Sequence, residues 1–220
     1  MYSSECENQV KRKITRIEPQ KKRKHRRSIF LDDEFAFGLD EEIIYRYGLK
    51  EGDEIADSDI EKLLLSEEKK AAKDRALHFL THRARSEKEV RDKLNEVGYD
   101  PPIVDWAIAE LKRLKLLDDV QFAVSFARSK MVTRPAGEHL LRRELKLKGI
   151  PDELIEKAIV EAYLEKSQRE VAQELAEKRS QQYKNLDPQK ARKRIADFLL
   201  RRGFDWEVVS EVIESRSRQH

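Results

Sequence analysis

Histidine and acidic pairs are the combinations in this sequence that come closest to metal or catalytic chemistry. His78 and His82 lie four residues apart, the spacing at which two imidazoles on one helix face can bind a metal ion. No third ligand follows at a motif spacing, and a histidine pair also suits the flank of an amphipathic helix. Asp118-Asp119 fits a helix cap better than an acid pair for magnesium. We therefore expect no metal site, no cofactor and no catalytic residues.

The glycine pattern argues against nucleotide chemistry. The chain has 7 glycines, and they never cluster into a phosphate-cradling loop or a dinucleotide fingerprint. Aspartate and glutamate are so numerous and scattered that none stands out as a general acid or base. The sequence thus predicts a protein that is not an enzyme.

A repeat organises the chain from about residue 70 onward. Gly98, Gly149 and Gly203 are 51 and 54 residues apart. Apolar residues recur at fixed distances from each glycine: one, five and ten residues after it (Tyr99, Ile150, Phe204; Ile103, Leu154, Val208; Ile108, Ile159, Ile213) and four and eight before it (Leu94, Leu145, Leu199; Val90, Leu141, Ile195). These spacings predict two helices that bury one side and are joined at a left-handed glycine.

A third amphipathic stretch precedes each helix pair, around Ala76, Phe122 and Val171. Each unit should therefore have three helices, with capping-box starts such as that of Ser167 and Glu170. Such triplets resemble helix-turn-helix modules that enter a groove, but they also resemble solenoid bricks that bind proteins, and the repeat alone leaves both open. We expect Trp106 and Trp206 to pack in the cores of their units, with base stacking as the alternative.

The N-terminal part has a different pattern. Two apolar runs at 28–31 and 34–37 flank Asp32-Asp33, which predicts a β-hairpin, and residues 39–48 predict a short helix. The expected fold is mainly α: a tandem array of three three-helix, helix-turn-helix-like repeats with a small β-containing N-terminal extension. The expected segments are a disordered tail (1–12), a β-hairpin and helix extension (13–68) and helical repeats at 69–117, 118–166 and 167–220.

Charge is strongly segregated along the chain, although the net charge is only +3. Residues 1–30 carry 10 basic and 3 acidic side chains, residues 31–68 carry 3 and 14, and residues 69–220 carry 33 and 26. The basic body favours an anionic partner. The single cysteine, Cys6, and the lack of a secretory or membrane-spanning pattern predict a cytoplasmic protein.

The densest basic run, residues 21–27, has three possible uses: phosphate contact, nuclear import, or a solvated strand edge that resists aggregation. The sequence leaves these uses open.

One run of motifs extends from Leu117-Asp118-Asp119 through Phe122-Ala123, Arg128, Pro135-Ala136-Gly137, Leu141 and Glu144-Leu145 to Lys148-Gly149-Ile150. A second extends from Arg83 to Val90 and on to Leu94 and Gly98-Tyr99. The order of these motifs resembles the RecX family of bacterial recombinase regulators, and residues 14–52 are similar to the family's N-terminal extension. The chain departs from the family at Lys115-Leu116, where many members carry a glycine, and at Arg134-Pro135, in place of a Gly-Pro pair.

This resemblance implies a partner, the RecA recombinase filament on single-stranded DNA. Family members are expected to be crescents that lie in the filament groove and inhibit strand exchange, ATP hydrolysis and filament growth, in DNA repair, homologous recombination and the SOS response. The protein should act as a monomer and should not bind membranes. The alternative is a DNA-binding helical-repeat protein that acts directly on duplex or single-stranded DNA.

The candidate contacts to RecA or DNA are solvated basic residues of the second and third units. They are Arg128, Arg134, Arg142, Arg143, Lys146, Lys148, Lys190, Arg192, Lys193, Arg194, Arg201 and Arg202. On helices this charged, many such side chains serve only to keep the outer face hydrated.

Overall fold

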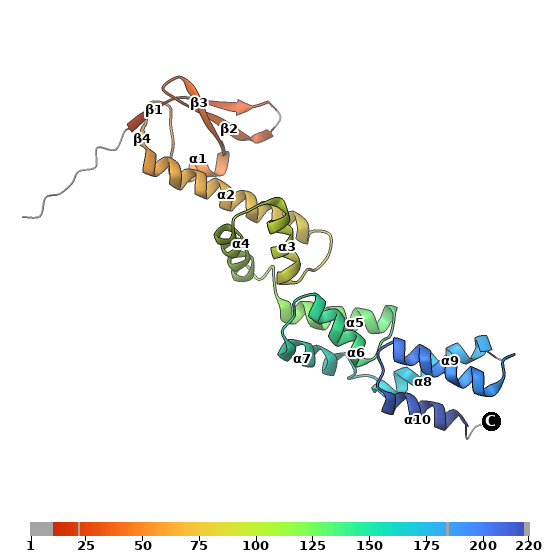
Figure 1. Cartoon of the computed structure of the whole chain (residues 1–220). Coiled ribbons are helices and arrows are strands. Elements are labelled where there is room, and N and C mark those ends of the chain that lie inside the picture. Colours follow the sequence, from red (N-terminus) through yellow and green to blue (C-terminus); the bar gives the residue numbers. More distant parts are fainter. Residues whose placement is uncertain (1–10, 22, 184, 218–220) are drawn as a thin grey trace, which may run out of the picture. The chain divides into compact units, whose positions relative to one another are not determined.

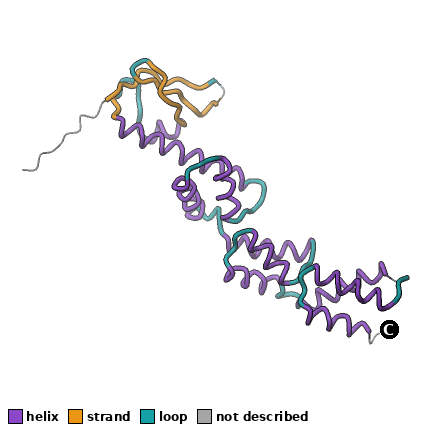
Figure 2. The backbone as a smooth tube through the Cα atoms, viewed as in Figure 1, coloured by secondary structure: helices purple, strands orange, loops and turns teal. Residues whose placement is uncertain are grey.

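The structure is a computed structural model that describes residues 11–21, 23–183 and 185–217. Residues 1–10 of the predicted tail, including Cys6, and Lys22 of the basic run lie outside the described residues. The chain divides into two compact units: the residues up to His78 with 98–107, and residues 79–97 with 108–220. Among the described residues, all strands belong to the first compact unit. From residue 57 onward, every regular element is helical (Figure 2).

A four-stranded antiparallel sheet forms the N-terminal part of the first compact unit (Figure 1). Its strands are β1 (Lys11–Gln20), β2 (Arg23–Leu31), β3 (Glu34–Asp40) and β4 (Glu54–Ala56), in the order β3-β2-β1-β4. The register places Ile29 opposite Ile17 on one side and Phe37 on the other. The predicted hairpin is confirmed as β2–β3, and two further strands that the sequence did not single out extend the sheet.

The turn between β2 and β3 is formed by two aspartates and contains no glycine. Asp32 and Asp33 both have positive φ, 50° and 68°. This is the geometry of a two-residue hairpin turn, whose twist matches that of the strands, and aspartate tolerates it better than most residues.

Apolar residues of the sheet and of the two helices that follow it share one core. Helix α1 (Glu41–Tyr47) contributes Ile43, and α2 (Asp57–Leu80) contributes Ile60 and Leu63. The strands supply Ile14, Ile29, Leu31, Leu39 and Ile55. Gly48 ends α1 in the left-handed conformation, with φ of 66°. The predicted short helix at 39–48 is thereby confirmed.

The acidic stretch at 31–68 neutralises the basic strands beside it. Arg26 lies 2.6 Å from Glu67, Arg27 pairs with Glu41, and Arg12 lies 2.6 Å from Asp57. The opposite charges seen along the sequence therefore meet within the first compact unit.

The helices from α2 to α10 make the three repeats. After α2, the first repeat has α3 (Glu87–Val97) and α4 (Pro101–Arg113). The middle repeat has α5 (Asp119–Thr133), α6 (Glu138–Leu147) and α7 (Asp152–Ala162), and the third has α8 (Gln168–Ser180), α9 (Pro188–Arg201) and α10 (Trp206–Ser217), with a 3₁₀ turn at Gln181–Tyr183. The predicted boundary between residues 68 and 69 falls inside α2, which runs without a break from Asp57 to Leu80.

Small residues recur at the centre of each repeat's first helix. Ala72 and Ala76, Ala123 and Ala127, and Ala172 and Ala176 are all buried. The predicted second-helix pairs Val90 and Leu94, Leu141 and Leu145, and Ile195 and Leu199 are buried as well. Alanine lets neighbouring helices approach closely while the larger residues fill the core.

The helix-joining turns have the predicted geometry. Gly98, Gly149 and Gly203 have φ of 95°, 77° and 84°, the left-handed conformation that ends a helix. Lys115 also adopts a positive φ, 57°, a conformation that glycine adopts more readily than other residues. The capping box of Ser167 and Glu170 and the cap by Asp118 are present as predicted, and Asp187 caps α9.

Within the second compact unit, the glycine turns also serve as joints between repeats. The Ser86 hydroxyl donates to the Lys148 carbonyl (2.7 Å), next to Gly149. One repeat later, the Gly137 N–H donates to the Arg202 carbonyl (2.9 Å), next to Gly203. In both joints, the start of a second helix packs on the glycine turn of the following repeat.

Candidate partner-binding surface

Most predicted contact residues of the middle repeat are held in ion pairs. Arg128 lies 2.6 Å from Glu161, Arg142 lies 2.9 Å from Glu156, and Lys146 lies 3.0 Å from Asp152. The ammonium of Lys148 lies 2.6 Å from Glu89 in the joint described above. Arg143 and Arg134 are exposed, and Arg134 caps the end of α5.

Helix α9 of the third repeat differs because its cations have no acidic partners among the described residues. Lys190, Arg192, Lys193 and Arg201 are exposed on α9, and no ion pair joins them to a carboxylate within the described part of the chain. Asp187, the nearest acidic residue before them, is occupied in capping α9 through the N–H groups of Gln189 and Lys190. This helix therefore presents uncompensated positive charge.

Next to these cations, arginines stack on two aromatic rings. The guanidinium carbon of Arg179 lies 5.3 Å from the ring centre of Tyr183 and 5.1 Å from that of Phe198. Arg202 lies 5.2 Å from the Phe198 ring, and Arg194 lies 5.7 Å from the Tyr183 ring. The stacking fixes the guanidinium groups at modest entropic cost and leaves N–H donors available.

We call this group the arginine–aromatic cluster, and it comprises Arg134, Arg179, Arg194, Arg202, Tyr183 and Phe198. Burial lowers the pKa of Arg202, and repulsion from Arg134 and Arg179 lowers it further. Arg202 donates to the Pro135 carbonyl (3.1 Å), and Arg179 donates to Tyr183 Oη (3.1 Å) and to Gln182 Oε1 (2.6 Å). Because no ion pair compensates these four arginines among the described residues, the cluster favours an anion such as a phosphate or a carboxylate.

The structure thus brings together Arg134, Arg194 and Arg202, which the sequence analysis named, and adds Arg179, which it missed. A signal was present: Arg179 and Tyr183, Arg194 and Phe198, and Phe198 and Arg202 are each four residues apart. Basic and aromatic residues at this spacing share a helix face.

The two tryptophans have different environments. Trp106 is partly buried, and Lys69 Nζ lies 5.5 Å from its ring centre. The prediction that Trp206 packs in a core is wrong, because 66% of its surface is exposed at the start of α10. Phe204 fills the core there instead, since it follows the glycine turn directly.

The basic run at 21–27 is only partly available for a partner. Arg26 and Arg27 pair with Glu67 and Glu41, and His25 lies 3.7 Å from Glu41. Lys21, Arg23 and Lys24 are exposed. Phosphate contact, nuclear import and protection from aggregation therefore remain open for these three residues, which lie where β1 meets β2.

Within the described residues, no group of three or more His, Cys, Asp or Glu side chains is arranged to hold a metal ion. No helix in the described part of the chain has the length and apolar character needed to cross a membrane.

Three-helix repeats in tandem define a helical-repeat protein, and α9 with the arginine–aromatic cluster gives it positive charge that no ion pair compensates among the described residues. Four family models match in chain order: the regulatory protein RecX N-terminal domain (residues 12–56) and the first, second and third three-helix domains of RecX (residues 72–111, 118–159 and 167–213). The chain belongs to the RecX family of regulatory proteins.

Individual relatives agree with this assignment. The regulatory protein RecX of Bacillus subtilis is 36% identical over 201 residues, which cover 91% of this chain and 76% of the relative. That of Listeria monocytogenes is 32% identical over 196 residues, covering 89% and 72%. A crystal structure of regulatory protein RecX covers 92% of this chain and 99% of its own at 28% identity, with a TM-score of 0.75. The crystal structure of RecX from Lactobacillus salivarius covers 68% and 97% at 28% identity, with a TM-score of 0.62.

Proposed function

We propose that this protein regulates RecA recombinase by binding the RecA filament on single-stranded DNA and restraining strand exchange, ATP hydrolysis and filament growth. In this role it would act as a cytoplasmic monomer in recombinational DNA repair and the SOS response. Family membership supports the regulatory role. The single observation that supports the binding surface is the positive charge of α9 and the arginine–aromatic cluster, which no ion pair compensates among the described residues.

The chemistry of that surface suits a filament made of protein and DNA. Arginine forks bind phosphates and carboxylates in the same two-pronged way, so α9 and the arginine–aromatic cluster could contact either component. Modest contacts from several repeats to one filament would add up through multivalency.

Direct DNA binding is the second candidate, and the same cations on α9 favour it. It predicts tight binding to bare duplex without recombinase. It also predicts a steep loss of affinity with salt, with a slope of about −0.9 per neutralised phosphate. The filament proposal predicts that assembled RecA on single-stranded DNA is bound more tightly than duplex at both low and moderate salt.

The deciding experiment compares the two ligands at two salt concentrations and follows RecA ATPase. We expect the protein to prefer the filament and to lower ATPase activity at or below stoichiometric ratios to RecA. Equal or tighter binding to bare duplex, with no effect on ATPase at any ratio, would overturn the filament proposal.

A pair of matched variants locates the surface. Arg192→Gln with Lys193→Gln removes two uncompensated charges, whereas Lys93→Gln with Arg113→Gln removes two charges that are paired with Glu96 and Glu110. The net charge changes equally in both. We expect the first pair to weaken filament binding about tenfold and the second to change it less than about twofold.

A further inference from the structure

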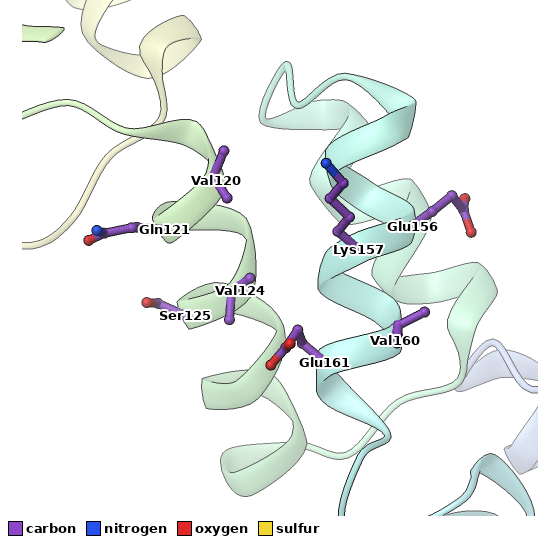
Figure 3. Close-up of a pocket in the computed structure, with 8 residues that line it drawn as sticks. All are labelled: Val120, Gln121, Val124, Ser125, Glu156, Lys157, Val160 and Glu161. Carbon is purple, nitrogen blue, oxygen red and sulfur yellow. The ribbon is translucent and has the colours of Figure 1, made fainter.

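The middle repeat has an open groove of about 760 Å³ between α5 and α7. Val120 and Val124 of α5 and Lys157 and Glu161 of α7 point into the space between the two helices (Figure 3). The outer flanks are formed by Gln121, Ser125, Glu156 and Val160. Arg128 bridges to Glu161 across the groove, 2.6 Å apart.

The groove can be compared with the same place in the first and third repeats, because the buried alanines align the first helices of all three repeats. The positions of Val120 and Lys157 correspond to Lys69 and Trp106 in the first repeat and to Arg169 and Glu211 in the third. Lys69 lies over the Trp106 ring at 5.5 Å, and Arg169 lies 3.4 Å from Glu211. In both flanking repeats, the two helices are therefore bridged by a favourable contact at this level.

In the middle repeat, Val120 and Lys157 occupy these two positions, and a valine cannot form a cation–π contact or an ion pair with the lysine. Val120 is 48% exposed although it points into the groove, so apolar surface is left in contact with water there. Val124 corresponds to Lys73 and Gln173, which are hydrophilic. Exposed apolar groups gathered in one hollow are typical of an interaction site.

The charged residues that line the groove indicate which kind of side chain could bind there. Glu156 is held by Arg142 and Glu161 by Arg128, whereas Lys157 has no ion-pair partner in the described part of the chain. An apolar side chain would fill the valine floor, and a carboxylate beside it would meet the Lys157 ammonium. A nucleic acid fits less well, because the valines offer no hydrogen bonds and the two glutamates repel phosphates.

We propose that the α5–α7 groove of the middle repeat binds a segment of the RecA protein in which an apolar side chain lies beside an acidic residue. This inference rests on the proposed function and assigns a protein contact distinct from the basic surface of the third repeat. The groove would give the middle repeat its own role in partner binding. In the first and third repeats, the Lys69–Trp106 and Arg169–Glu211 contacts bridge the two helices at this place.

The test uses the flanking repeats as a guide to closing the groove. Val120→Arg puts a charged side chain on the floor, and Val120→Arg with Lys157→Glu rebuilds the Arg169–Glu211 pair of the third repeat. The single variant raises the net charge and the double variant lowers it. A long-range electrostatic effect would therefore change affinity in opposite directions, whereas closure of the groove weakens binding in both.

Binding is measured with full-length protein and RecA assembled on single-stranded DNA, with bare single-stranded DNA as the second ligand. We expect both variants to bind the filament about tenfold more weakly, the size of losing one well-packed interface contact, with unchanged DNA binding. Val132→Arg, at a residue of α5 that is 84% exposed and outside the groove, should bind as the unmodified protein does.

The outcomes separate the two proposals. If the unmodified protein does not bind the filament, the proposed function fails and the groove assignment fails with it. Filament binding within about twofold of the unmodified protein by both groove variants overturns the groove alone. Equal loss of bare DNA binding by both variants also overturns it, since the groove would then take nucleic acid. Circular dichroism and thermal unfolding confirm that each variant is folded.

Discussion

Gly137 and Gly203 meet so closely that a Cβ atom on Gly137 would lie 2.2 Å from the carbonyl oxygen of Gly203. The obstacle is backbone, so a flexible side chain cannot move aside to relieve it. Gly137 itself has an ordinary φ of −75°. We expect Gly137→Ala to destabilise the protein by about 2–4 kcal/mol, because the joint between the second and third repeats must open.

Urea unfolding checks this prediction, and Gly98→Ala is its matched control. Gly98 has a φ of 95°, and a Cβ atom added there would have no other atom within 4 Å. Alanine at this position should therefore cost only about 1–2 kcal/mol of backbone strain. A Gly137→Ala variant as stable as the unmodified protein would contradict the proposed closeness of this joint.

Glu89 should make the other joint sensitive to acid. Burial alone raises the pKa of Glu89, but hydrogen bonds from Arg83, Lys148 and the Ser86 backbone lower it to about 2. Because the folded-state pKa lies below the usual 4.5, the stabilisation is complete above pH 4.5 and is lost as pH falls toward 2. We expect Glu89→Gln to cost about 2 kcal/mol at pH 7.

The measurement is the free energy of unfolding for both proteins between about pH 7 and pH 3. The difference between them should shrink steadily below about pH 4.5, since the unfolded form of the unmodified protein then takes up a proton that its folded form does not. A difference that stays constant across this range would show that the charge of Glu89 does not stabilise the joint.

The repeats could be predicted from the sequence because their determinants are local. A left-handed glycine, an apolar residue after it and apolar positions at helical spacing all lie within one unit of about 50 residues. The joints could not be predicted, since they depend on which distant turn a helix start meets. Ser86 accepts locally from the Glu89 N–H at the start of α3, yet its hydroxyl also donates to the carbonyl of Lys148, 62 residues away.

The candidate surface was predictable only in part for a related reason. Sequence position identifies a basic residue but not its ionic partner, so Arg142 and Lys190 were equivalent candidates. In the structure, Arg142 is held by both oxygens of Glu156 from a different helix, and Lys190 is exposed on α9. Trp206 was misplaced because its residue type was weighed without its place in the repeat: it lies three residues after Gly203, where the other repeats have the exposed Pro101 and Asp152.

Tyr163 should contribute one partly buried hydrogen bond to stability. Its hydroxyl donates to the Ala136 carbonyl at 2.6 Å, next to Gly137. Burial raises the pKa of Tyr163, with Glu138 and Asp205 adding repulsion, so the neutral donor persists in alkaline solution. We expect Tyr163→Phe to destabilise the protein by about 1–2 kcal/mol, because the carbonyl loses its donor. Tyr45→Phe, at a residue that is 89% exposed, should leave the unfolding midpoint unchanged.

Arg179 distinguishes the geometry of the arginine–aromatic cluster from its charge. Arg179→Lys keeps the positive charge but loses the planar group that stacks on Tyr183 and Phe198. We expect about threefold to tenfold weaker binding to RecA on single-stranded DNA, with an unchanged salt slope. Arg179→Ala should bind more weakly still and reduce the slope by about 0.7, since one charge is lost. If the lysine variant binds as tightly as the unmodified protein, only the charge at this position matters, and the stacked arrangement has no role in recognition.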